Sequence, residues 1–205
     1  QEPIGPLALP GSYAVSLAKR VDGQVTALAE PQSFAAEPLG SASLPAPDRA
    51  ALLAFQKQTG KLQRAVLGSV EAAKEAQKRL DHLRKALDDT PAADPELAAQ
   101  ARALERRLKE LQTELSGDRV VAKHNEPTPP SIVDRVQGIV GGHWVTTAAP
   151  TETHRRAYTI AAEQFAGVLE RLRTLVEQDL AGLEDRAEAS GAPWTPGRVP
   201  RWSPD

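Results

Sequence analysis

The 205-residue chain contains neither cysteine nor methionine, and aromatic residues make up only 4% of it. Without cysteine the chain can form no disulfide and no thiolate metal site. Because methionine is missing even at position 1, we expect the chain to be a processed product or a piece of a longer protein. No apolar run approaches the ~20 residues that a transmembrane helix needs, so the sequence predicts no membrane span.

The net charge of the chain is also small, with a formal value of −2 at pH 7. This gives no strong electrostatic attraction to nucleic acid, and we expect no nucleic-acid partner. Few aromatic residues beside abundant alanine and leucine are typical of helices packed by small and aliphatic side chains. The 17 prolines punctuate the helical stretches. The composition therefore predicts a mainly α-helical fold.

The stretch from Asp48 to Thr90 contains no proline and carries the clearest helical pattern. Its inward positions alternate in steps of three and four, as in a coiled-coil seam. They are Leu52, Phe55, Thr59, Leu62, Val66, Ser69, Ala73, Ala76, Leu80, Leu83 and Leu87. Asp48 is a good N-cap. A helix of this length spans roughly 65 Å and cannot bury its stripe alone, so the rest of the chain should supply packing partners.

A second helix is predicted to begin at Asp94-Pro95 and to end at Gly117. Its inward positions are Leu97, Ala101, Leu104, Leu108, Leu111 and Leu115. The short connection to the first helix favours antiparallel neighbours. Residues 118–130 are predicted to form a long connection.

Two more helices follow. Ser131 with Asp134 resembles a capping box for a short helix that Gly141-Gly142 should end. Thr151 should cap a last long helix that runs to about Ser190. Together residues 48–190 predict a long antiparallel helical bundle of three long legs, one of them broken by the 118–130 loop.

Residues 12–37 predict a β-hairpin that precedes the helices. Side chains alternate along SYAVSLAKR, and Asp22-Gly23 is a strong hairpin turn signal. Pro31 must lie at a bulge or an edge. Because a lone hairpin is marginal in water, this one should be the end of an Ig-like sandwich, or pack on the helices or on a partner. Residues 1–11 and 38–47 are predicted linkers, and 191–205 a tail rich in tryptophan and proline.

Motifs of catalysis are missing: the sequence has no phosphate-binding glycine loop, HExxH, GxSxG or CxxC. We therefore predict no catalytic residue and no cofactor. His82 should lie on a polar helix face. His124, His143 and His154 flank the short helix and could converge on a metal, but their spacing fits no known ligand pattern, which favours surface positions.

The most distinctive local feature is the loop Asn125–Pro130 together with His143-Trp144. One interpretation is a rigid loop with a tryptophan that closes the end of the bundle. The alternative is a partner or ligand surface that both loops form. Its candidate residues are Arg119, His124, Arg135, His143 and Trp144.

The motif Pro10-Gly11-Ser12-Tyr13-Ala14-Val15, the Asp22-Gly23 turn, a closing strand and a long Ala/Leu helical region resemble a bacterial family. Pro127-Thr128 and Pro150-Thr151 resemble its loops. The family is the C-terminal region of secreted BNR-repeat or sortilin-like (VPS10-type) glycosyl hydrolases. In that family, β-propellers precede an Ig-like domain and a helical region.

The resemblance implies a non-catalytic C-terminal helical module of a larger secreted protein, which mediates assembly or partner contact. It implies secretion, or a periplasmic or cell-surface location, in a bacterium. The partner would be the propeller-bearing remainder or another copy of the chain. Two alternatives stay open: part of a glycosyl hydrolase-type enzyme with a site near residues 118–130, and a stand-alone coiled-coil scaffold.

Overall fold

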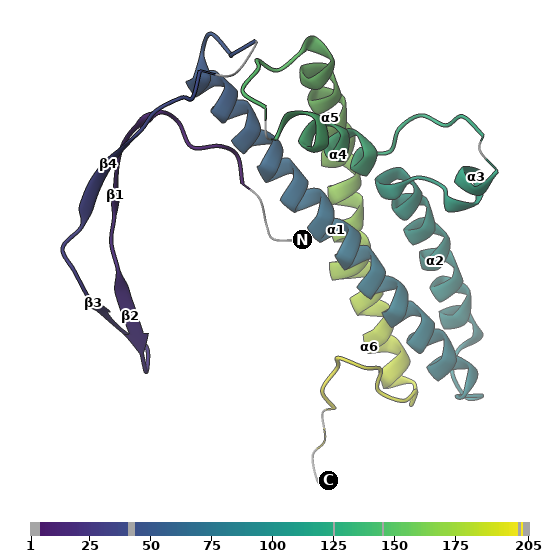
Figure 1. The fold of residues 1–205 in the computed structure, drawn as a ribbon. Coiled ribbons are helices and arrows are strands. Elements are labelled where there is room, and N and C mark those ends of the chain that lie inside the picture. Colours follow the sequence, from purple (N-terminus) through teal and green to yellow (C-terminus); the bar gives the residue numbers. More distant parts are fainter. Residues whose placement is uncertain (1–4, 41–43, 125, 145, 201, 203–205) are drawn as a thin grey trace.

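The protein is mainly helical, with a small antiparallel hairpin sheet at its N-terminal end (Figure 1). The structure is a computed structural model that describes residues 5–40, 44–124, 126–144, 146–200 and 202, without the side chains of residues 119 and 122. Two parts stand apart in it. We call residues 11–36 the arm and residues 49–189 the helical body.

The arm is the predicted hairpin, divided into two short ladders. Its strands are β1 (Gly11–Val15), β2 (Ala18–Val21), β3 (Gln24–Ala27) and β4 (Gln32–Ala36). β1 pairs with β4 and β2 pairs with β3, both antiparallel. Asp22 and Gly23 have φ angles of 48° and 82°, which a tight type I′ turn requires. Pro31 lies in the break between β3 and β4, where no ladder needs its missing N–H.

The predicted first helix is α1 (Arg49–Asp88), 40 residues long. The Asp48 side chain accepts a hydrogen bond from the Ala51 N–H at 2.9 Å, which confirms the N-cap. Each predicted inward residue is buried except Leu62, which is partly buried against the same core. The three-and-four spacing therefore located the buried stripe correctly.

The second helix, α2 (Pro95–Ser116), begins after the N-cap Asp94 and ends at Gly117, as expected. All six of its predicted inward residues are buried. Within the predicted 118–130 connection the chain forms one further short helix, α3 (Arg119–Lys123).

The short helix α4 spans Ile132–His143. Ser131 and Asp134 form the predicted capping box: the Asp134 N–H donates to Ser131 Oγ and the Ser131 N–H donates to Asp134 Oδ2. The prediction that Gly141-Gly142 ends this helix is wrong. Helical hydrogen bonding continues to the Trp144 N–H, which donates to the Val140 carbonyl, because the buried His143 ring fixes the last turn.

The last long helix runs without interruption through α5 (Glu152–Thr174), a π-helical segment η1 (Leu175–Leu180) and α6 (Ala181–Ala189). Thr151 caps it, with its hydroxyl accepting from the His154 N–H. The π segment was not predicted. It lets both Leu175 and Leu180 remain fully buried.

These helices share one hydrophobic core. α1 packs on α2, α4 and α5, and α2 also packs on η1 and α6 (Figure 1). The core runs from Val66 to Ala192 along the chain and draws residues from every long helix. Among the helices of the described part, none combines the length and apolar character that crossing a membrane requires.

Candidate functional site

The structure does not bring the residues of the predicted partner or ligand surface together: Arg135 lies in the first turn of α4, and His124 directly follows α3. The exposed His124 precedes the helix, whereas His143 and Trp144 form its end. The two ends of this helix of 12 residues lie about 18 Å apart. Arg135 is half-buried on α4, and its Nε is buried without a hydrogen-bond partner. The side chain of Arg119 lies outside the described part of the structure.

His143 is 2% exposed, so the expectation that it lies on the surface is wrong. Its Nε2–H donates to the Ala148 carbonyl at 3.2 Å, and its ring meets the edge of Phe55 with centroids 5.6 Å apart. Burial lowers the pKa of His143, opposed by the bond to Ala148 and reinforced by the nearby charges of His154 and Arg155. The imidazole is therefore held neutral and serves packing.

His154 is the other histidine of this cluster. Its ring centroid lies 5.2 Å from that of His143, and its Nδ1 is buried without a hydrogen-bond partner. His82 and His124 are both exposed, as the sequence predicts. Within the described residues there is no group of three or more His, Asp or Glu side chains that could hold a metal ion.

Trp144 follows the last residue of α4, and its indole ring packs against α1. A Cβ atom added at Gly60 of α1 would lie 2.8 Å from Cη2 of the Trp144 indole, so glycine permits this close approach. Gln56, one turn earlier on α1, is buried and donates from Nε2 to the His143 carbonyl at 3.0 Å. These contacts attach the end of α4 to α1 and give Trp144 a packing role.

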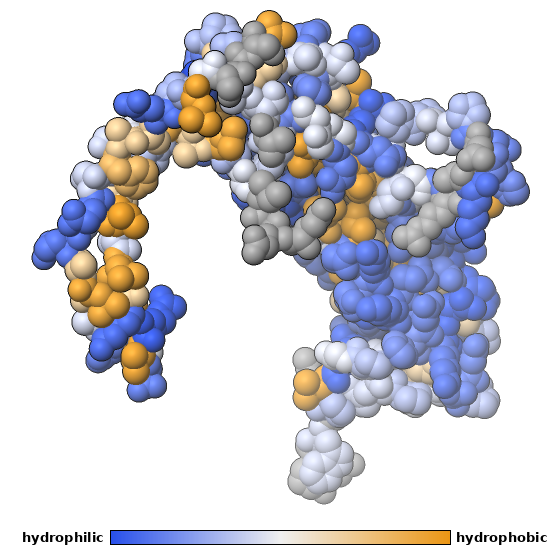
Figure 2. Space-filling view, viewed as in Figure 1, coloured by the Kyte–Doolittle hydropathy of each residue, from blue (hydrophilic) through white to orange (hydrophobic). Residues whose placement is uncertain are grey.

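The arm is the most exposed part of the molecule. Every residue of its four strands is exposed except the half-buried Ala36. Figure 2 shows hydrophobic residues all along it, mixed with hydrophilic ones. Large apolar side chains that stay in water usually mark an interaction surface when they form a contiguous patch.

Strand pairing places these apolar residues on one face. Tyr13 lies opposite Phe34 with the two rings stacked at 5.8 Å, and the Leu28 N–H donates to the Leu17 carbonyl at 2.8 Å. Directly opposite residues share a face, and so do alternate residues along a strand. One face therefore carries most of the large apolar residues, and we call it the apolar arm face. Its apolar members are Tyr13, Val15, Leu17, Val21, Leu28 and Phe34, and it also holds the polar residues Lys19, Gln24, Thr26 and Gln32. The other face carries Arg20 and Val25 beside small residues: Ser12, Ala14, Ser16, Ala18, Ala27, Ser33 and Ala35.

The linker that follows the arm contacts the helical body, where the Ala46 N–H donates to the Thr147 carbonyl at 2.7 Å. A cavity of about 430 Å³ lies between α1 and the chain segments on either side of the arm. Its lining is mostly apolar and includes Leu7, Leu9, Pro38, Leu52 and Leu53. Neither ladder packs on a described helix, so the body leaves the apolar arm face uncovered.

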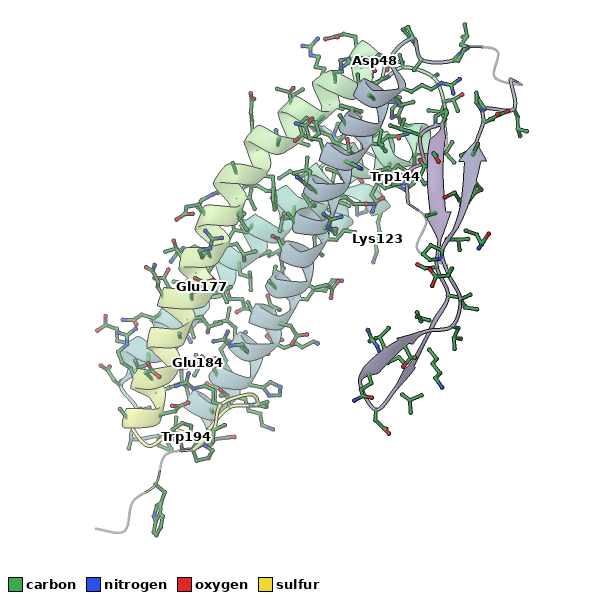
Figure 3. All side chains as sticks on the ribbon, turned by 90° about the vertical axis from the view of Figure 1, so that its left-hand side faces the viewer. Asp48, Lys123, Trp144, Glu177, Glu184 and Trp194 are labelled. Carbon is green, nitrogen blue, oxygen red and sulfur yellow. The ribbon has the colours of Figure 1, made fainter. Side chains whose placement is uncertain are left out.

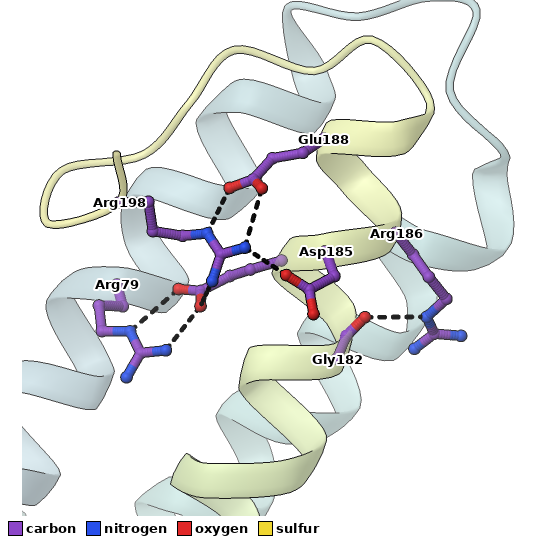
Figure 4. A network of polar contacts seen from close by, with 7 residues as sticks. Arg79, Gly182, Asp185, Arg186, Glu188 and Arg198 are labelled. Carbon is purple, nitrogen blue, oxygen red and sulfur yellow. Dashed lines mark hydrogen bonds and ion pairs between the residues drawn. The ribbon is translucent and has the colours of Figure 1, made fainter. Parts of the chain in front are cut away.

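The opposite end of the body holds a network of ionised side chains, near the residues Glu184 and Trp194 in Figure 3. Glu184 of α6 is 1% exposed and accepts two hydrogen bonds from Arg79 of α1, at 2.9 and 2.6 Å. Arg198 of the tail lies 3.5 Å from Glu184 and also pairs with Asp185 and Glu188 (Figure 4). Hydrogen bonding to Glu188 raises the pKa of Arg198. The network fastens the tail to the body.

Sequence reasoning missed this network, although one signal was present. Glu184 lies four residues after Leu180 and three before Ala187. This spacing places Glu184 on the inward face of the last helix. An acidic residue at such a position needs a buried cationic partner. Nothing in the spacing identified Arg79 or Arg198 as that partner, because both are distant in sequence.

Comparisons of the chain with protein-family models, with curated proteins and with solved structures find no match.

Proposed function

We propose that the chain is a non-catalytic helical module of a larger secreted bacterial protein of the BNR-repeat or sortilin-like (VPS10-type) kind. In this role the arm makes the contact with a partner, and the helices act as an antiparallel bundle that spaces and supports it. The observation that carries the proposal is the uncovered apolar arm face. A two-stranded ribbon is marginal in water, so a covering surface would stabilise it.

One contact supports the assignment of the arm as the end of an Ig-like sandwich. The Tyr13 hydroxyl donates to the Leu9 carbonyl, four residues upstream, at 2.5 Å. A tyrosine that hydrogen-bonds back to the backbone a few residues upstream forms the tyrosine corner of such sandwiches. Tyr13 belongs to the same Pro-Gly-x-Tyr-x-Val motif that carries the family resemblance.

The enzyme alternative would need a site near residues 118–130. The loop before α4 and the His143-Trp144 end of α4 are separated by the length of that helix, which favours the assembly role. The stand-alone scaffold alternative accounts for the long helical seams, but it does not explain why the arm exposes large apolar side chains.

The test is the mass and composition of the native particle from the source bacterium, measured by denaturing and native mass spectrometry. We expect the 22.0 kDa sequence to occur within, or bound to, a larger propeller-bearing polypeptide in the secreted fraction. Hydrogen exchange of the arm amides should be slower in that particle than in the purified chain. A free monomer whose arm amides exchange equally fast in both samples would overturn the proposal.

A further inference from the structure

We propose that the turn between α4 and α5 contains an acid-sensitive joint, which holds the linker of the arm at neutral pH and releases it in acid. The joint consists of residues 146–148, which lie between His143 of α4 and Ala46 of the linker that follows the arm. This inference goes beyond the proposed function, because it concerns how the arm is held to the helical body and applies whichever partner covers the arm.

Two hydrogen bonds connect the joint to the linker and to a buried histidine. The Ala46 N–H donates to the Thr147 carbonyl at 2.7 Å. The next carbonyl, that of Ala148, accepts from Nε2 of His143 at 3.2 Å. Ala46 and His143 are both buried. A change at the imidazole therefore reaches the linker through two adjacent peptide groups.

The charged groups that face His143 are cationic. From α5, the ring centroid of His154 lies 5.2 Å from that of His143, and the guanidinium of Arg155 lies 5.8 Å over the Phe55 ring. The same Phe55 ring meets the His143 imidazole edge-on. From α1, the residues that contact His143 are Phe55 and Gln56, and neither carries a charge.

The acidic residues nearest along the chain do not neutralise this cluster. Asp48 caps α1, and Glu152 is exposed in the first turn of α5. The charged residues of α4 itself, Asp134 and Arg135, lie in its first turn, at the opposite end of that helix. Tyr158 of α5 packs edge-on against Phe55. Within the described residues, no carboxylate forms an ion pair with the histidine or the arginine of α5 that face the joint.

A proton on His143 is therefore unfavourable while the joint is closed. Burial lowers the pKa of this imidazole from 6.5, the bond to Ala148 opposes the shift, and the charges of His154 and Arg155 reinforce it. Once the joint opens, the ring reaches water and regains its ordinary pKa, so the open form binds the proton more strongly. Each unit of pH below about 6.5 then favours the open form by up to about tenfold.

Opening is local because the joint is a small part of the structure. It exposes far less apolar surface than unfolding of the helices, so it requires less free energy. The helical body should therefore stay folded while the linker loses its bond to the joint. Acid would then free the arm to change its position relative to the body.

Two buried alanine amides provide a matched pair for the test. The Ala46 N–H donates to the joint, and the Ala192 N–H donates to the Ala187 carbonyl at 3.0 Å, at the opposite end of the body. Hydrogen exchange of the full 205-residue chain, followed by NMR from about pH 7.5 to about pH 5, would give the protection factor of each amide. We expect the protection of Ala46 to fall at least about tenfold over this range and that of Ala192 to stay constant.

Two adjacent arginines of α5 test the cause of the opening. Both are exposed, but only Arg155 is among the charges that act on His143. Arg155→Glu places a carboxylate near the imidazoles and should reduce the acid-induced loss of protection at Ala46 at least about threefold. Arg156→Glu makes the same change of charge and should leave that loss as it is in the unsubstituted chain.

The imidazole itself is tested by His143→Gln, which retains an N–H donor but takes up no proton in this range of pH. It should abolish the acid-induced loss of protection at Ala46, whereas His124→Gln, at an exposed position, should not. If the buried substitution prevents folding, the two arginine variants decide the question, because they change exposed residues only.

Three results would overturn the inference: constant protection of Ala46 across the range of pH, loss of protection at Ala46 and Ala192 together, or equal effects of the two arginine substitutions. The second result would mean that acid unfolds the whole body. None of the three bears on the proposed function, which the composition of the native particle decides.

Discussion

Replacing Gly60 or Gly68 by alanine makes the same chemical change at two places on α1, eight residues apart. In a helix interior, alanine is more favourable than glycine by about 1 kcal/mol. At Gly68 a Cβ atom meets nothing within 4 Å, so the full gain should appear. At Gly60 the same Cβ would lie 2.8 Å from Cη2 of Trp144, closer than such contacts occur.

The two substitutions should therefore differ by the cost of that collision. Overpacking a well-filled site costs about 1–3 kcal/mol. We expect Gly68→Ala to stabilise the protein by about 1 kcal/mol and Gly60→Ala to leave it unchanged or destabilise it by up to about 2 kcal/mol. For a chain of this length a difference of 2 kcal/mol corresponds to roughly 4–8 °C in Tm.

Thermal and urea unfolding, followed by circular dichroism at 222 nm, would measure both variants. The cause is tested by repeating Gly60→Ala in a Trp144→Ala background, where the penalty should disappear. Equal stabilisation by the two alanines in the natural background would show that Trp144 does not pack over Gly60. A penalty that persists without the indole would refute the assignment of its cause.

Two further predictions concern buried polar groups. Arg79→Ala leaves the buried carboxylate of Glu184 with Arg198 as its remaining cationic partner, and it should lower the free energy of unfolding by about 3 kcal/mol. The control variant Lys74→Ala removes an exposed ion pair and should lower it by less than ~0.5 kcal/mol. Urea titration would measure both variants. The pKa of His143 is lowered from 6.5 in the folded state, so the unfolded chain takes up its proton first as pH falls. Stability should therefore drop below about pH 6.5, and the drop should be smaller in His143→Gln. An unaltered pH dependence in that variant would refute the role of the buried imidazole.

Most of the helical architecture could be predicted from local signals. The caps Asp48, Asp94, Ser131 and Thr151 all form, because a capping side chain needs only backbone N–H groups a few residues away. The inward positions were also predictable, since a repeating step of three and four residues fixes one face of a helix whatever it packs against.

The π segment shows where local reasoning lost accuracy. The apolar stripe of the last helix moves from Leu175 to the adjacent Val176, which is a break of one residue in the repeat. A π turn absorbs one extra residue and keeps both sides of the break facing the core. The sequence therefore contained a signal for the π turn. A break in the repeat can also mark the end of a helix, and the packing of η1 on α2 is what keeps this helix continuous through the break.

His143 and the arm had no such local signal. Gly141-Gly142 favours a helix end, and only tertiary contacts with Phe55 and Ala148 keep His143 helical and buried. In the arm, alternation predicted which side chains share a face, and the strand pairing agrees. Alternation implies one buried face, yet this molecule buries neither. We expect a partner surface to supply the missing half of that pattern, because a two-stranded ribbon alone is only marginally stable in water.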